Sequence, residues 1–384
     1  MAKKLRIAFV RRGYSSSGGA EAYLKRLARG VVQAGHEVKL ITTAEWPDDQ
    51  WPFGPITRLE ATSVTGFAND LEESHQQLDY DILFSLERVW TCDVYRAGDG
   101  VHRAWLARRA RFELPLRQFA RALNRKHREL LQLEKSLFEN RKASRVIVAS
   151  QMIKDEIVDL YGYPAEKIAL IRNGIPLDEF GCIPELREKS RNNLNIKPEQ
   201  IALLFAGSGW ERKGLFFAIQ AMALSKNTKL RLLVAGRGNE TLYKTRRVRF
   251  WRDEPVHFLG EVTDMLPLYA AADVFILPTI YDPFSNACLE ALACGLPVIT
   301  TKSNGFSEIV TDGVHGSIID ESTNLIHLRD AIRFWSDSSH RAAARSSTIK
   351  RASQFDISKN VEQTLEILVQ AASADSTSGK MRKT

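Results

Sequence analysis

The sequence of 384 residues has few cysteines, no long apolar run and no clustered metal ligands. Its four cysteines, Cys92, Cys182, Cys288 and Cys294, lack the spacing of a metal site, which fits a reducing cytoplasm. No apolar run approaches the ~20 residues of a transmembrane helix. The first residues are too short in their apolar part for a signal peptide and lead straight into a strand. We therefore expect a cytoplasmic protein without a membrane span or a bound metal.

The composition, 44% hydrophobic and 26% charged, is typical of a soluble globular protein, and the length favours two domains. The net charge of +8 indicates an anionic partner. A nucleic acid, a lipid surface and a phosphorylated substrate all fit that charge.

Apolar runs typical of buried strands alternate with helical patterns along the chain. This alternation predicts an α/β fold with parallel strands. We expect strands at residues 6–10, 37–42, 56–60, 82–86, 145–150, 168–175, 202–206, 230–235, 256–260, 274–277 and 298–301. We expect helices over about 22–32, 126–140, 151–161, 215–224, 264–272, 286–294, 324–335 and 355–371, and a disordered tail over 373–384.

The stretch of residues 275–301 predicts strand, loop, helix and strand in sequence. Asp282 lies in the loop, Ser285 or Asn286 is a good helix N-cap, and Glu290 lies inside the helix. The amides around residues 284–287 could hold a phosphate at the helix start, and Glu290 could accept hydrogen bonds from vicinal hydroxyls. An ordinary β-α-β unit with a solvated Glu is the alternative.

A second glycine turn, Gly207-Ser-Gly-Trp-Glu-Arg-Lys-Gly214, follows a predicted strand. Its adjacent cations, Arg212 and Lys213, come just before the helix at 215–224, where positive charge is unfavourable unless an anion lies between them. Both side chains suit a diphosphate. A plain surface turn is the alternative.

The first glycine turn, residues 11–21, joins a strand to a helix and contains Gly18 and Gly19. Its backbone amides could approach an anion or a sugar closely. The spacing is neither that of a dinucleotide fingerprint nor that of a Walker loop. A flexible turn without a ligand remains the alternative.

Asp99 and His102 follow the strand at 82–86 and are close in sequence. Asp99 could hydrogen-bond a sugar hydroxyl, and His102 could bind a hydroxyl or a phosphate. A surface or core histidine is the alternative for His102.

Residues 103–128 carry nine basic side chains against one acid, Glu113, with aromatic and leucine residues between them. This pattern favours contact with an anionic membrane surface, where each Lys or Arg contributes ~1 kcal/mol. A solvated basic helix face is the alternative, and no motif of a nucleic-acid reader is present.

The acid pair Asp282 and Glu290, with Ala-x-Ala-x-Gly-x-Pro-Val after it, and the run Gly-x-x-x-x-Arg-Lys-Gly resemble the signatures of retaining nucleotide-sugar glycosyltransferases of family 4. The chain carries Asp282 where that family usually has Glu. The resemblance implies the GT-B fold, with two Rossmann-like doubly wound domains facing a central cleft. It places the first domain at 1–175, the second at 176–355, and a last helix and tail at 356–384 that return to the first domain.

The same resemblance implies the role of each site residue. Glu290 would hold the ribose hydroxyls, and Asp282 with the amides of Phe284, Ser285 and Asn286 would lie at the donor sugar. Arg212 and Lys213 would stabilise the departing diphosphate in place of a metal ion. Gly18 and Gly19 would lie near the donor phosphate and the acceptor, and Asp99 would face the donor sugar.

Asp99 and the basic segment are similar to the lipopolysaccharide inner-core glucosyltransferases of this family. The implied reaction moves glucose from UDP-glucose to a heptose of the inner core, at the cytoplasmic face of the membrane and without a cofactor. The expected partners are the nucleotide sugar, the lipopolysaccharide acceptor and an anionic membrane surface, with no nucleic acid. A phospholipid-linked sugar transferase and an inactive basic scaffold on the membrane are the alternatives.

Overall fold

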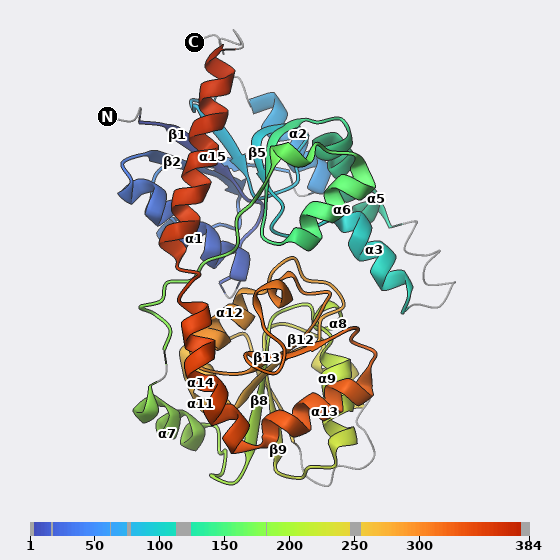
Figure 1. Cartoon of the computed structure of the whole chain (residues 1–384). Helices are drawn as coiled ribbons and strands as arrows, with labels where there is room; N and C mark the ends of the chain where they lie inside the picture. Colours follow the sequence, from blue (N-terminus) through green and yellow to red (C-terminus); the bar gives the residue numbers. More distant parts are fainter. Residues whose placement is uncertain are drawn as a thin grey trace. The chain divides into compact units, whose positions relative to one another are not determined.

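The computed structural model describes residues 4–16, 18–61, 63–74, 78–112, 124–181, 183–245 and 255–377 (Figure 1). The chain divides into two compact units. Unit 1 comprises Met1–Asn173 and Ile357–Thr384, and unit 2 comprises Gly174–Asp356. The first division falls inside the run Asn173-Gly174-Ile175, so a turn sequence separates the two units.

Unit 1 is built on a parallel sheet with the strand order β3-β2-β1-β4-β5-β6-β7. Its strands are β1 (Arg6–Val10), β2 (Glu37–Thr43), β3 (Ile56–Leu59), β4 (Ile82–Ser85), β5 (Cys92–Arg96), β6 (Ala143–Val148) and β7 (Ile168–Leu170). Its helices are α1 (Gly19–Gln33), α2 (Val64–Ser74), α3 (His102–Ala110), α5 (Arg125–Glu134), α6 (Gln151–Tyr161) and α15 (Ile357–Thr377), with a π-helical turn over Lys135–Glu139.

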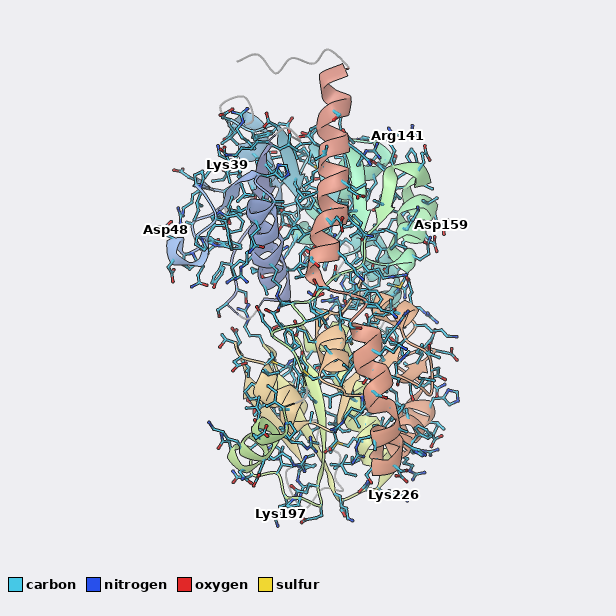
Figure 2. All side chains as sticks on the ribbon, turned by 60° about the vertical axis from the view of Figure 1, so that its left-hand side comes forward. Lys39, Asp48, Arg141, Asp159, Lys197 and Lys226 are labelled. Carbon is cyan, nitrogen blue, oxygen red and sulfur yellow. The ribbon has the colours of Figure 1, made fainter. Side chains whose placement is uncertain are left out.

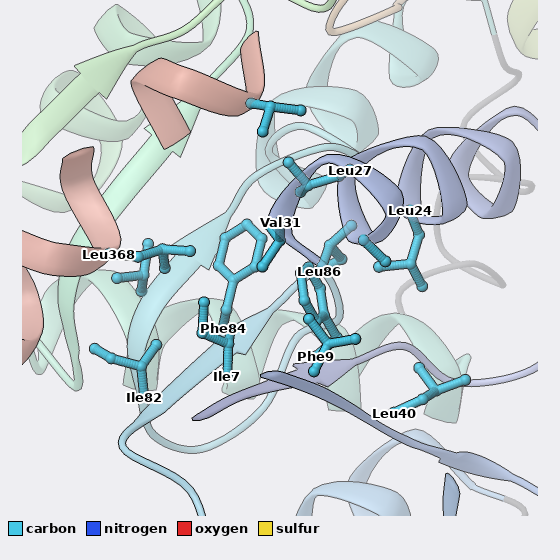
Figure 3. Close-up of a cluster of buried hydrophobic side chains, with 14 of the residues drawn as sticks. Ile7, Phe9, Leu24, Leu27, Val31, Leu40, Ile82, Phe84, Leu86 and Leu368 are labelled. Carbon is cyan, nitrogen blue, oxygen red and sulfur yellow. The ribbon is translucent and has the colours of Figure 1, made fainter. Parts of the chain in front are cut away.

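The core of unit 1 follows from the register of its central strands. Phe9 of β1 pairs with Leu40 of β2 and with Phe84 of β4, so the three side chains lie on the same face of the sheet. Helix α1 covers that face with Leu24, Leu27 and Val31, and α15 covers it with Leu368 (Figure 3). All of these side chains are fully buried, which fixes the carboxyl ends of β1 and β4 beside each other.

Unit 2 repeats the plan with the strand order β10-β9-β8-β11-β12-β13, again all parallel. Its strands are β8 (Ile201–Ala206), β9 (Leu230–Ala235), β10 (Val256–Gly260), β11 (Val274–Leu277), β12 (Val298–Thr301) and β13 (Gly316–Ile319). Its helices are α7 (Pro184–Asn193), α8 (Trp210–Lys213), α9 (Leu215–Ser225), α10 (Glu240–Thr245), α11 (Leu266–Ala271), α12 (Asn286–Ala293), α13 (Leu325–Ser336) and α14 (Ser338–Ala352).

In each sheet the strand order reverses beside the first strand, at β1 and β4 in unit 1 and at β8 and β11 in unit 2. Loops that leave the carboxyl ends of strands at such a switch point form the usual ligand crevice of an α/β sheet. The prediction of an α/β fold with two Rossmann-like doubly wound sheets is confirmed.

The structure corrects several predicted elements. Strands β5 and β13 and helix α14 were not expected from the sequence. Helix α14 is hard to recognise because only Ala344, Thr348 and Ala352 are buried on it, so it has no apolar stripe. Asp337 starts it by accepting a hydrogen bond from the Ser339 amide at 2.8 Å.

Two other predicted boundaries were wrong. The strand expected over 168–175 is only Ile168–Leu170, and Pro176 follows soon after. The last helix runs to Thr377, so the predicted tail at 373–384 begins inside it, and residues 378–384 lie outside the described part.

Among the residues that the structure describes, three non-glycine residues have left-handed backbone, each at the end of a helical segment, and Asn195 after α7 has φ of 53°. Arg141 follows the π-helical turn and Lys226 ends α9, each with φ of 56°. Both side chains are exposed and point away from the body of their unit (Figure 2). These ends therefore carry no glycine signal that the sequence could show.

Within the part of the chain that the structure describes, no helix is long and apolar enough to span a bilayer.

Candidate active site

The segment after β8 carries the two predicted diphosphate ligands. The chain turns through Gly207 and Gly209 into the four-residue helix α8, which ends with Arg212 and Lys213. We expected these cations just before α9, and they do precede it, but the one-turn helix α8 that carries them was not expected. Gly214, with φ of 79°, ends α8 and is also the N-cap of α9.

The loop after β11 binds this segment through backbone contacts. The Thr279 hydroxyl and the Ile280 amide donate to the Arg212 carbonyl at 2.8 and 2.9 Å. Arg212 Nη1 in turn donates to the Tyr281 carbonyl at 2.9 Å. A Cβ on Gly214 would lie 1.9 Å from the carbonyl oxygen of Pro278, so only glycine allows the loops to meet this closely. The loops after β8 and β11 therefore pack tightly against each other at the switch point of the sheet.

Lys213 and Asp282 form a nearly buried ion pair. The Lys213 ammonium donates to the Asp282 carboxylate, and their side chains are 12% and 5% exposed. An ammonium has three N–H donors, so Lys213 can keep Asp282 and still donate to a phosphate oxygen. The structure brings these two predicted site residues together, 69 positions apart in the sequence.

Asn304, in the segment that follows β12, anchors the same loop and was missed as a site residue. It is fully buried, and its side-chain oxygen accepts from the amides of Ser285 and Phe306 at 3.3 and 3.1 Å. Its amide nitrogen donates to the Thr300 hydroxyl at 3.0 Å. An asparagine before a glycine at a strand end was the available signal, but its partner Ser285 lies on another strand's loop.

The start of α12 places the next predicted residues. Ser285 is the N-cap and accepts from the Cys288 amide at 3.4 Å, which decides between the two N-caps that the sequence allowed. Phe284 is buried and packs edge-on against Phe306, with ring centroids 5.9 Å apart. Asn286 opens the helix and is half-buried. Because the Phe284 ring is buried in this packing, Phe284 can serve as the predicted ligand only through its backbone amide.

Glu290 lies on α12 and is oriented by Tyr269 of α11, a partner that the sequence did not reveal. The Tyr269 hydroxyl donates to Glu290 Oε2 at 2.9 Å. Burial, with the nearby Glu290 charge, raises the pKa of Tyr269 well above its usual value, so the phenol keeps its proton and remains a donor.

Gly18 and Gly19 lie where α1 begins in unit 1, with Gly18 as the N-cap. A Cβ on Gly18 would lie 1.8 Å from Glu21 Oε2, while a Cβ on Gly19 would meet nothing within 4 Å. Gly18 therefore makes room for the carboxylate of Glu21. Whether either glycine approaches a ligand stays a prediction.

Asp99 lies in the loop after β5, and its side chain is 47% exposed. Its Oδ2 accepts from Arg11 Nη1 at 3.3 Å, a partner 88 positions away that was not predicted. His102 begins α3 and is buried, and its Nε2 lies 3.0 Å from Nδ1 of His127 on α5. The structure thus places the His102 imidazole against a second histidine, whereas Asp99 reaches solvent.

The basic segment is only partly described, because residues 113–123, with Arg117 and Arg121, lie outside the described part. Two of its arginines are committed to α6. Arg108 pairs with Glu156 at 2.7 Å, and Arg103 donates to the Leu160 carbonyl at 2.9 Å. Arg111, Lys126 and Arg128 are exposed.

Among the residues that the structure describes, no three His, Cys, Asp or Glu side chains are grouped so that they could hold a metal ion. Arg212 and Lys213 supply positive charge at the switch point of unit 2.

Two family models match the chain: "Glycosyltransferase Family 4" over residues 17–179 and "Glycosyl transferases group 1" over residues 200–335. Together they cover most of both units. The chain belongs to glycosyltransferase family 4. This confirms the predicted resemblance and the prediction of a nucleotide-sugar-dependent hexosyltransferase.

The glycosyltransferase is similar to the lipopolysaccharide glucosyltransferase WaaG of Escherichia coli K12, with 26% identity over 340 residues, 85% of this chain and 88% of WaaG. A crystal structure of WaaG superposes with a TM-score of 0.82 and 24% identity, covering 94% of this chain and 99% of that one. HepE of Anabaena in complex with UDP-glucose gives a TM-score of 0.74 and 20% identity, over 95% of this chain and all of HepE. These likenesses confirm the GT-B fold.

Proposed function

We propose that this glycosyltransferase moves glucose from UDP-glucose, with retention at the anomeric carbon, to a heptose of the lipopolysaccharide inner core. The observation that carries the proposal is the pairing of Lys213 with Asp282 beside Arg212, at the carboxyl ends of β8 and β11. The position is the ligand crevice of a parallel sheet, and its cations suit a diphosphate. The name of WaaG and the ligand in the HepE complex support the sugar and the nucleotide.

The proposed chemistry uses side chains of the chain alone. Arg212 and Lys213 stabilise the charge that develops on the departing diphosphate, and a buried site makes that interaction stronger than in water. The acceptor hydroxyl loses its proton to the leaving phosphate, so no enzymic base is required. Glu290, held by Tyr269, accepts the ribose hydroxyls.

The proposed acceptor is membrane-borne, and the exposed cations Arg111, Lys126 and Arg128 are proposed to contact lipid phosphates on the inner face of the membrane. Replacing all three with Gln should abolish sedimentation with anionic liposomes. Lys197→Gln, at an exposed lysine of unit 2, is the control and should bind as the wild type does. Unchanged binding of the triple variant would refute the membrane contact.

The donor is tested by a thermal-shift panel of nucleoside diphosphates and their sugars. Ligand at ~100 times its dissociation constant adds ~2.7 kcal/mol of stability, which such an assay detects easily. The proposal expects stabilisation by UDP and more by UDP-glucose. No shift with any nucleotide contradicts the donor site and favours the inactive scaffold.

The acceptor is tested by transfer of labelled glucose to heptose-terminated lipopolysaccharide, with a phospholipid-linked sugar assayed in parallel. Label in the lipopolysaccharide supports the proposal. Label only in the lipid-linked sugar moves the enzyme to the alternative acceptor class.

A further inference from the structure

Helix α8 has only four residues, and the two proposed diphosphate ligands lie at its end. A helix of one turn is not stable by itself, because its first turn fixes several backbone dihedrals in return for one hydrogen bond. The positions of Arg212 and Lys213 therefore depend on the contacts that the rest of unit 2 makes with α8. The loop after β11 supplies some of these contacts, and the segment after β9, residues 236–238, supplies others.

Trp210, the first residue of α8, anchors this helix in unit 2. Its buried ring packs against Phe258 of β10 and Tyr243 of α10, with ring centroids 5.3 and 5.5 Å apart. Gly238 lies so close to the ring that a Cβ there would overlap it. Tilted and edge-on aromatic contacts of this kind favour one orientation of the ring. The indole ring thus ties α8 to β10, α10 and the segment after β9.

These contacts use the ring of Trp210 and not its N–H group. Among the residues that the structure describes, the buried Nε1 of Trp210 has no hydrogen-bond partner. A buried indole N–H usually finds an acceptor, so the shape of the ring decides which side chain fits here. A phenylalanine ring would keep most of the packing without burying an unpaired donor.

The backbone that leads into α8 is held by the segment after β9. The Gly207 amide donates to the Ala235 carbonyl at 3.0 Å, and the Gly209 amide donates to the Arg237 carbonyl at 3.2 Å. A Cβ on Gly236 would lie 2.5 Å from the Gly207 carbonyl oxygen, so the two segments meet through glycine backbones.

The stem of Lys213 lies over the same glycine turn. A Cβ on Gly207 would lie 3.4 Å from Cε of Lys213, which is a van der Waals contact. Arg212 and Lys213 share the single turn of α8 with Trp210, so a shift of the indole ring moves both cations. We infer that Trp210 is the positioning residue that holds these two cations against the departing diphosphate. This inference rests on the proposed function.

The first test measures release of UDP from UDP-glucose by full-length Trp210→Leu, with heptose-terminated lipopolysaccharide as the acceptor. We expect kcat to fall by roughly 10- to 100-fold, because small misplacements of catalytic groups have effects of this size. The KM for UDP-glucose should change less than kcat, since both charges remain near the ground-state diphosphate. An unchanged kcat would overturn the inference.

A double-mutant cycle with Lys213→Ala asks whether Trp210 acts through the cations. If it does, Trp210→Leu should lower the kcat of the Lys213→Ala variant by less than it lowers that of the wild type. Effects that multiply would overturn the inference.

The conservative variant separates the ring from its N–H group. Trp210→Phe should keep kcat within about threefold of the wild type, because it retains an aromatic ring of similar shape. A Phe variant as slow as Trp210→Leu would contradict a role of the ring in positioning.

Gly238→Ala disturbs the same ring from the other side of the contact and serves if Trp210→Leu fails to fold. Its methyl group would overlap the indole, so kcat should fall as it does in Trp210→Leu. Gly181→Ala is the matched control, because a Cβ there would meet nothing within 4 Å, and its kinetics should equal those of the wild type. Equal rates in the two alanine variants would count against the inference.

Trp335→Leu controls for a purely structural role of a buried tryptophan. Trp335 donates to the Ser317 hydroxyl at 2.9 Å, near the amino end of β13 and away from the carboxyl ends that form the site. This variant should lower the melting temperature and leave kcat unchanged. A kcat that follows the melting temperature in both leucine variants would overturn the inference. Wild-type enzyme that releases no UDP contradicts the proposed function, whereas active wild type with normal Trp210→Leu contradicts only the inference.

Discussion

The segments that follow β1 and β8 both carry two adjacent cations, but the fold gives those cations different carboxylate partners. Each follows the first strand of a parallel sheet, lies beside the switch point and carries two adjacent cations, Arg11 with Arg12 and Arg212 with Lys213. Around Arg11 the fold brings three carboxylates. Around the second pair it brings one, Asp282, together with the Tyr281 carbonyl.

The same pair of adjacent cations can therefore bind different ligands, because the side chains that the fold places around each pair determine which of its donors remain available. An arginine whose donors face carboxylates is not available to a phosphate, whereas a lysine with one carboxylate partner retains donors for it. The unit 2 cations therefore fit the diphosphate proposed for them, whereas Arg11 already has carboxylate partners.

The largest effect is expected on the unit 2 side. Lys213→Ala should lower kcat by at least ~10²-fold, because it removes a buried cation from the departing diphosphate. Steady-state kinetics with UDP-glucose measure this. Lys302→Ala is the control, since Lys302 pairs with Asp320 at a site where both side chains are more than 60% exposed. Equal rates in Lys213→Ala and wild type would contradict the role of the cation pair.

A smaller effect is expected from a substitution in unit 1 that displaces Glu21 from Arg11. Gly18→Ala places a methyl group on the Glu21 carboxylate and should displace it from Arg11. We expect kcat/KM to fall by about tenfold, with only a small change in melting temperature.

The control for that variant is Gly98→Ala. Gly98 precedes Asp99, and a Cβ there would meet nothing within 4 Å, so the activity should be unchanged. If Gly18→Ala is as active as Gly98→Ala, Glu21 does not support the site.

The smallest effect is expected at Tyr269. Tyr269→Phe removes one hydrogen bond to Glu290, which is worth about 1.5–3 kcal/mol when the partner is charged, and part of that loss is regained from water. The KM for UDP-glucose should rise several-fold, with kcat nearly constant, because ribose binding is the same in the ground and transition states. A fall in kcat with unchanged KM would give Glu290 a different role.

Much of the unit 2 site could be predicted because it is local in sequence. The N-cap Ser285, the acid eight positions before Glu290 and the Gly-x-x-x-x-Arg-Lys-Gly run each lie within one strand-loop-helix segment, where turn and cap preferences apply directly. The buried strands β1, β8 and β11 were equally clear from their apolar runs.

The rest could not be predicted because it depends on pairs that are far apart in sequence. Arg11 meets Asp99 across 88 positions, and Lys213 meets Asp282 across 69, so neither pair leaves a spacing pattern. Nothing in the sequence near Asn304 or Tyr269 indicates that they contact Ser285 and Glu290, because those contacts depend on the strand order. Strands β5 and β13 are short and partly polar, which weakens the apolar signal.

The most direct test of the contrast between the two segments is calorimetric titration of UDP, without sugar, into wild type, Lys213→Ala and Asp99→Asn. UDP carries the diphosphate but no hexose, so it should use only the unit 2 cations. We expect Lys213→Ala to weaken the Kd at least tenfold, which is about 1.4 kcal/mol, and Asp99→Asn to leave it unchanged. A Kd weakened equally by both variants, or by Asp99→Asn alone, would contradict the division of tasks between the two segments.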